Sequence, residues 1–138
     1  MRPAVLDYLA GSDHIIHAGD IGDPAVLEAL AALAPLTAVR DNNDTDAWAD
    51  GLAETADLII GGLRLHVIHD IAMLDPAHGA DAVICGHSHR PRIEYVGECL
   101  QVNPGSAGRR RFKLPICAGC LWIAGAGIEP EVRHFDPE

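Results

Sequence analysis

The first half of the chain alternates short apolar runs with segments of helical pattern. Apolar runs that predict buried strands lie at residues 14–17, 36–39, 58–60, 63–68 and 82–85. Residues 3–10 predict a short helix, because Leu6 and Leu9 lie at helical spacing. Pro24 suits the first turn of a second helix, which we expect to continue to residue 33.

The second half has a different pattern. Its apolar runs at residues 92–102, 117–124 and 128–134 predict successive strands with turn residues between them, and no helix of useful length. A half in which strands alternate with helices, followed by a half made of strands, is typical of two packed sheets with helices outside. The pattern therefore predicts an α/β fold.

The composition argues against several classes of protein. The formal net charge is −10, from 10 basic and 20 acidic residues, which argues against a broad basic face that holds nucleic acid stably. The longest mildly apolar stretch, at residues 116–128, is too short to span a membrane, and the first residues lack the apolar segment of a signal peptide. We therefore expect a cytoplasmic protein with reduced cysteines and no membrane contact.

Residues able to bind a metal follow four of the apolar runs. Asp20 comes after the first run and Asn42 after the second. His69 follows the third, and His87 with His89 the fourth. Ligands of open α/β sheets bind at the carboxyl ends of strands, so these distant residues can meet in one site. A carboxylate, an amide oxygen and three imidazoles without a thiolate suit Mn²⁺, Fe²⁺, Zn²⁺ or Ni²⁺.

Five short motifs resemble, in order, those of the calcineurin-like metallophosphoesterases. They are Gly19-Asp20-Ile21-Gly22-Asp23, Asp41-Asn42-Asn43-Asp44, Val67-Ile68-His69-Asp70, Gly86-His87-Ser88-His89 and Asn103-Pro104-Gly105-Ser106. They are similar to those of the small bacterial phosphodiesterase branch typified by YfcE. The resemblance covers essentially the whole chain. It implies a single domain over residues 1–138 with a four-layer α/β/β/α sandwich.

The resemblance also implies a role for each matching residue. Asp20 would bridge two metal ions, and Asn42, His69 and His87 would complete one of the two metal sites. His89 would contribute to the other site. Asn43 stands where many relatives have a histidine that acts on the leaving group, so it is the candidate catalytic residue. The implied activity is hydrolysis of a small phosphate ester, above all a phosphodiester, by a metal-bound hydroxide that attacks phosphorus in line.

The chain departs from the family pattern at three places. The family begins with a strand that ends in Asp-x-His, and we expect this strand to be missing here. One of the two metal sites would then keep only Asp20 and His89. We therefore expect tight binding of one ion, at the other site. Without its neighbouring strand, the strand at 14–17 would have an unpaired edge. A second copy of the chain could bind there, so a homo-oligomer stays possible. Asp41 and Asp70 replace glycines, and Asp70 adds negative charge close to the metals.

The sequence alone leaves two other functions open, and it gives several histidines no role in metal binding. One alternative is a non-catalytic protein-binding scaffold, the role of a retromer subunit with this fold. The other is a structural metal protein in which one ion stabilises loops. The histidines outside the motifs are predicted to be structural or solvated: His14, His66, His78 and His134. His17 is left open as a residue that orients a ligand.

Overall fold

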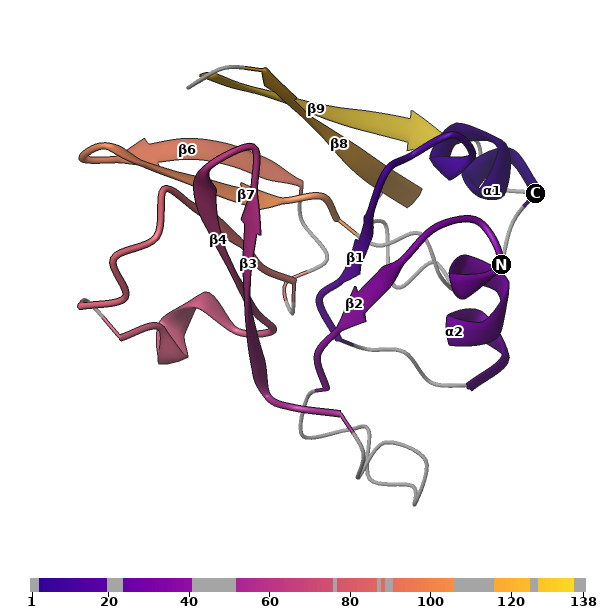
Figure 1. Cartoon of the computed structure of the whole chain (residues 1–138), viewed down its shortest axis with the longest axis horizontal. Helices are drawn as coiled ribbons and strands as arrows, with labels where there is room; N and C mark the ends of the chain where they lie inside the picture. Colours follow the sequence, from indigo (N-terminus) through magenta and orange to yellow (C-terminus); the bar gives the residue numbers. More distant parts are fainter. Residues whose placement is uncertain are drawn as a thin grey trace.

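The computed structural model describes residues 3–19, 24–40, 52–75, 77–86, 88, 91–105, 116–124 and 127–135. Within this part of the chain, short helices and strands alternate in the first half and strands alone fill the second (Figure 1). The predicted α/β class is therefore confirmed. The longest described helix has eight residues, and no described helix is long and apolar enough to cross a membrane.

The helices and strands of the first half follow the predicted segments closely. They are α1 (Pro3–Leu9), β1 (Ile15–His17), α2 (Pro24–Ala31), β2 (Leu36–Ala38), β3 (Thr55–Ile60), β4 (Leu63–Ile68), the 3-10 helix η2 (Ile71–Met73) and β5 (Ala82–Ile84). Except for η2, which the pattern does not predict, their ends differ from the predicted ones by at most three residues. The apolar periodicity was thus sufficient to locate the other elements.

The second half contains β6 (Arg92–Val96), β7 (Cys99–Asn103), β8 (Ile116–Ala124) and β9 (Gly127–Phe135). The segment 92–102, predicted as one strand, is a hairpin of β6 and β7. Gly97, at φ +63°, lies in the turn between them. A glycine adopts this conformation without the steric cost that a side chain would add, so the chain reverses there.

The strands form three sheets within the described residues. β1 and β2 are parallel, β8 and β9 are antiparallel, and the largest sheet has the order β3-β4-β5-β7-β6. In this five-stranded sheet β4, β5 and β7 run parallel, so their carboxyl ends meet at one edge. His69 directly follows β4, Gly86 follows β5 after one residue, and Asn103 ends β7. His69, the predicted ligand that the structure describes, therefore lies at this edge.

The core is formed between the five-stranded sheet and the two smaller sheets. The sheet contributes the buried side chains Leu65, Ala82, Ile84, Leu100 and Val102. β1 and the β8–β9 hairpin pack against them through Ile16, Ala18, Leu121, Ile123 and Ile128. The arrangement agrees with the predicted packing of sheet on sheet.

The outer layers differ on the two sides of the molecule. Helices α1 and α2 lie on the side of β1 and β2 that faces away from the five-stranded sheet (Figure 1). On the outer face of the five-stranded sheet, Leu74 and Ala80 pack over Ile68, Val83 and Cys85. The helix described there is η2, a single 3-10 turn. The fourth, helical layer of the predicted sandwich stays a prediction.

We predict that Leu65→Ala destabilises the fold by about 2–5 kcal/mol, because it opens a cavity between the sheets. Leu65 is 2% exposed. Ile59→Ala on the neighbouring strand is the control: Ile59 is 75% exposed, and its truncation should cost about 0.5 kcal/mol or less. Urea unfolding of both variants measures the difference. Equal midpoints would contradict the packing described above.

Candidate metal centre

His69 has the orientation expected of a metal ligand. Its side chain lies at the end of β4, the residue is 7% exposed, and Nδ1 is 2.6 Å from the carbonyl oxygen of Ala18. A carbonyl oxygen can only accept a hydrogen bond, so Nδ1 carries the proton and the neutral ring has its lone pair at Nε2. Metal-binding histidines characteristically donate their other ring N–H in this way. The ring therefore fits a divalent ion at Nε2.

Two glycines allow the backbone to approach this ring. Gly19 has φ +102°, and a Cβ there would lie 2.3 Å from His69 Nδ1. A Cβ on Gly86 would lie 3.2 Å from the Ala18 carbonyl oxygen that accepts the His69 bond. Any side chain at Gly19 would displace the ring, whereas a Cβ at Gly86 would require the Ala18 carbonyl to shift by only a few tenths of an ångström. The close approach of His69 thus explains the first glycine of one predicted motif, Gly19.

Backbone hydrogen bonds join the strand ends around His69. The Gly86 N–H donates to the His69 carbonyl oxygen at 2.9 Å. The Gly86 carbonyl oxygen accepts from Ser88 N at 2.9 Å and from Asn103 Nδ2 at 2.8 Å. The ends of β1, β4, β5 and β7 are therefore connected through one set of contacts. Sequence reasoning had given Asn103 no role beyond its place in a motif.

The other predicted site residues lie outside the described part of the chain. They are Asp20, Asn42, Asn43, His87 and His89. Among the described residues, no three His, Cys, Asp or Glu side chains form a group that could hold a metal ion. Of the predicted ligands, only His69 is among those residues, so its geometry tests one member of the set. The roles of the other five residues stay predictions.

Two of these residues are sequence neighbours of described residues around His69. Asp20 directly follows Gly19, and His87 lies between Gly86 and Ser88. Both glycines are in contact distance of the His69 ring or of its carbonyl partner. Where the side chains of Asp20 and His87 lie stays a prediction.

Asp70, which stands where relatives have glycine, has a structural function. Its Oδ1 accepts a hydrogen bond from Ala72 N at 3.0 Å, so it caps the 3-10 helix η2. The backbone at Asp70 is extended, with φ −111° and ψ 114°, a conformation that any residue adopts. Nothing in the local conformation requires glycine, and the cap explains the aspartate.

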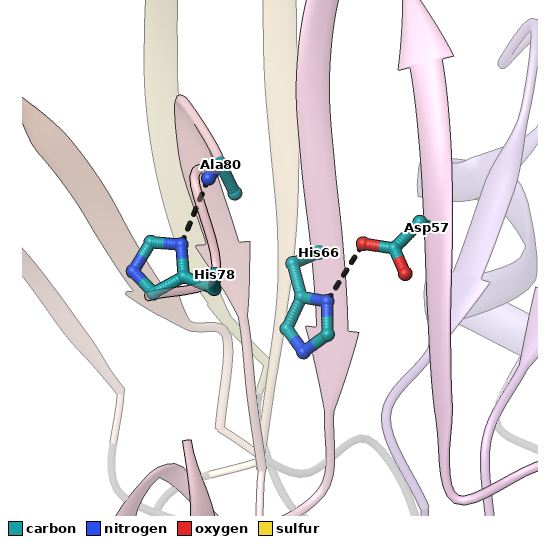
Figure 2. A network of polar contacts seen from close by, with 4 residues as sticks. All are labelled: Asp57, His66, His78 and Ala80. Atoms are coloured by element: carbon teal, nitrogen blue, oxygen red, sulfur yellow. Dashed lines mark hydrogen bonds and ion pairs between the residues drawn. The ribbon is translucent and has the colours of Figure 1, made fainter. Parts of the chain in front are cut away.

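The histidines outside the motifs make contacts away from His69. On β4, His66 Nδ1 lies 2.8 Å from Asp57 Oδ1 of β3, directly across the strand pair (Figure 2). His78 accepts from Ala80 N at Nδ1, and its ring stacks against that of His66 with centroids 6.3 Å apart. His14 Nε2 lies 2.7 Å from Thr37 Oγ1. These contacts support the structural role predicted for the three histidines.

Cys85, which lies two residues before His87 in the sequence, is a buried thiol. Its Sγ donates weakly to the Val102 carbonyl oxygen at 3.6 Å. Burial raises the pKa of its thiol to about 11, because the thiolate would lose its hydration. The thiol therefore stays neutral at physiological pH in the metal-free chain.

Comparison with known proteins identifies the family. The sequence pattern of the calcineurin-like phosphoesterase superfamily domain matches residues 1–125. The chain belongs to this family. A probable metallophosphoesterase of Methanocaldococcus jannaschii is 34% identical over 110 residues, which cover 75% of this chain and 57% of the relative. The chain thus spans little more than half the length of that relative.

Two further relatives agree with this assignment. A probable metallophosphoesterase of Methanothermobacter thermautotrophicus is 31% identical over 139 residues, covering 94% of this chain and 80% of the relative. The crystal structure of Vps29 from Entamoeba histolytica in complex with Zn²⁺ has a TM-score of 0.76. It is 20% identical, over 99% of this chain and 91% of Vps29, a likeness that shows the fold alone. Membership of a metallophosphoesterase family implies divalent metal ions.

We predict that Gly19→Ala lowers both the melting temperature and the affinity for Zn²⁺, because the added methyl group displaces the His69 ring. Gly11→Ala is the matched control: Gly11 also has positive φ, +84°, but a Cβ there meets nothing within 4 Å. Each variant pays the strain of positive φ, about 1–2 kcal/mol. Calorimetric titration should show weaker Zn²⁺ binding in Gly19→Ala alone. Equal affinities in the two variants would show that Gly19 does not constrain the site.

We also predict that Cys85 reacts slowly with iodoacetamide at pH 8. Raising a thiol pKa from about 9 to about 11 lowers the thiolate fraction about 100-fold at this pH. Mass spectrometry should find Cys85 alkylated at least that much more slowly in the folded chain than in urea. A rate that urea leaves unchanged would contradict the burial of this thiol.

Proposed function

We propose that the chain is a metal-dependent phosphodiesterase with ligands Asp20, Asn42, His69, His87 and His89. The observation that carries this proposal is the His69 ring, which is buried and donates from Nδ1 to the Ala18 carbonyl oxygen, the contact that metal-binding histidines commonly make. Membership of the calcineurin-like phosphoesterase family supports the reaction class. The substrate is a small phosphate ester, since a net charge of −10 disfavours nucleic acid.

The residues would divide the task between binding and orientation. When bound, divalent ions supply positive charge to the phosphoryl oxygens and lower the pKa of a coordinated water. The Ala18 carbonyl holds the proton on His69 Nδ1, so the ring stays in the tautomer that binds at Nε2. The Asn43 amide would donate a hydrogen bond to the leaving oxygen but deliver no proton. Esters with good leaving groups are therefore the preferred substrates.

The ligand chemistry narrows the metals to test. Imidazole and carboxylate ligands suit Mn²⁺, Zn²⁺, Fe²⁺ and Ni²⁺. Zn²⁺ and Mn²⁺ come first: Vps29 of Entamoeba histolytica, which shares the fold, binds Zn²⁺ in its crystal structure. Of the two sites that the family implies, the one built from Asp20, Asn42, His69 and His87 is proposed to bind its ion tightly.

One observation favours a protein-binding scaffold as the second candidate. Strand β6 forms an edge of the five-stranded sheet, and its apolar side chains Ile93, Tyr95 and Val96 are 43%, 61% and 53% exposed. Exposed apolar residues beside an open strand edge are a feature of interaction surfaces. A scaffold of this kind would bind a partner without hydrolysing phosphodiesters.

We predict that Asp20→Ala and His87→Ala each abolish tight Zn²⁺ or Mn²⁺ binding in calorimetric titrations. Each removes a direct ligand, so kcat/KM for an activated aryl phosphodiester should fall at least ~100-fold, the upper range found for residues that merely orient ligands. His134→Ala on β9 is the control, because His134 is exposed and distant in sequence from the motifs.

Three outcomes separate the candidate functions. Metal binding and turnover that are lost together in Asp20→Ala and His87→Ala support the phosphodiesterase. Tight metal binding by the parent chain without turnover favours the scaffold or a structural metal. Parental affinity in both alanine variants would show that the ligand assignment is wrong.

A further inference from the structure

Two polar side chains are buried in the described part of the chain: His69, which is 7% exposed, and Asn103, which is 6% exposed. The first belongs to the proposed ligand set, whereas the second has no assigned function. A buried amide destabilises the fold unless its hydrogen-bonding groups are satisfied. An apolar side chain at this position of β7 would avoid that requirement, so the contacts of Asn103 indicate what the amide is for.

The Asn103 side chain uses both of its ends. Its Nδ2 donates to the Gly86 carbonyl oxygen at 2.8 Å and to Ser88 Oγ at 3.1 Å. Its Oδ1 accepts from the Gly105 N–H at 2.9 Å. These partners define the orientation of the amide, because the Gly105 N–H requires an acceptor and the Gly86 carbonyl a donor. The amide therefore connects the end of β7 to the loop that follows β5.

The two residues bound by Nδ2 are the neighbours of His87 on either side. Gly86 is also held from the other direction, since its N–H donates to the His69 carbonyl oxygen at 2.9 Å. Displacing this loop from the sheet would thus break bonds to both Asn103 and His69. A ligand between two anchored residues has fewer conformations to lose when it binds a metal.

We infer that Asn103 is a positioning residue for His87: its amide holds the loop so that this imidazole is preorganised for the metal. The inference rests on the proposed function, because His87 is a ligand only under that proposal. Asn103 itself does not touch the metal or the ester. Its effect on metal affinity passes through Gly86 and Ser88.

The test compares Asn103→Asp with Gln101→Glu in the full chain. Both changes convert an amide to a carboxylate of the same shape. Gln101 lies two residues earlier on β7, so it is on the same side of the strand, but its side chain makes no hydrogen bond to the Gly86 or Ser88 backbone. Asn103→Asp removes both Nδ2 donors and places an acceptor against the Gly86 carbonyl oxygen. The control therefore corrects for the added charge.

Two readouts are measured on each variant. Calorimetric titration with Zn²⁺ should show affinity 10- to 100-fold weaker in Asn103→Asp, the loss typical of residues that orient ligands. The affinity of Gln101→Glu should stay within about twofold of the parent. Hydrogen–deuterium exchange of the metal-free chain should be faster in peptides that cover residues 86–90 of Asn103→Asp alone. The second readout needs neither metal nor turnover.

Ser88→Ala provides a milder variant that keeps the Gly86 bond. It removes one acceptor of Asn103 Nδ2, so Zn²⁺ affinity should fall only about two- to tenfold, with a smaller increase in exchange. Should Asn103→Asp fail to fold, Ser88→Ala decides the question: unchanged affinity and unchanged exchange would overturn the inference.

The outcomes distinguish this inference from the proposed function. If His87→Ala loses Zn²⁺ but Asn103→Asp keeps parental affinity and exchange, Asn103 is not a positioning residue and the proposed function stands. If His87→Ala keeps parental affinity, the ligand assignment is wrong, and the positioning of a metal ligand by Asn103 is overturned with it. Weaker affinity and faster exchange in Asn103→Asp, with both unchanged in Gln101→Glu, support the inference.

Discussion

The hydrogen bond from His69 Nδ1 to the Ala18 carbonyl oxygen connects two sheets and orients a proposed metal ligand. Ala18 follows β1 of the two-stranded sheet, whereas His69 follows β4 of the five-stranded sheet. The bond is short, at 2.6 Å, and partly buried, so it is stronger than a fully solvated one. It determines the tautomer of the ring and the relative position of the two strand ends at once. The glycine at 19 is a consequence of this contact, because the ring occupies the space that a side chain there would need.

A site built in this way depends on the backbone more than on exposed side chains. The carbonyl groups of Ala18, His69 and Gly86 each accept a bond from a residue of another strand end. Parallel strands bring these ends together, and the loops that carry the proposed ligands begin there. Rigid strands locate ligands more accurately than free loops do. The shared edge of β4, β5 and β7 therefore explains why residues far apart in sequence can act together.

The family and the geometry support metal-dependent hydrolysis in different ways. Family membership supplies the reaction class and implies divalent ions. The geometry shows His69, a proposed ligand, buried and donating from Nδ1 to a carbonyl oxygen, as metal-binding histidines commonly do. A scaffold could retain the same fold with an unused site, and the exposed apolar residues of β6 are the feature that would then matter. Hydrolysis would require the buried polar groups at the strand ends, whereas binding of a partner protein would not. Substitutions of His69 and Asn103 therefore distinguish the two functions.

The sequence by itself determined the α/β class, the places of most helices and strands, and the chemical type of the proposed site. Periodicity and turn residues are local properties, so they can be recognised without knowing which strands are neighbours. They failed at residues 92–102, where the turn at Gly97 was read as part of one strand. Tertiary structure alone decided the tautomer of His69, the need for glycine at 19, and the contacts of Asn103. The physical reason is sequence separation: His69 and Ala18 are 51 residues apart, and Asn103 and Gly86 are 17 apart, so only the folded sheets bring them into contact.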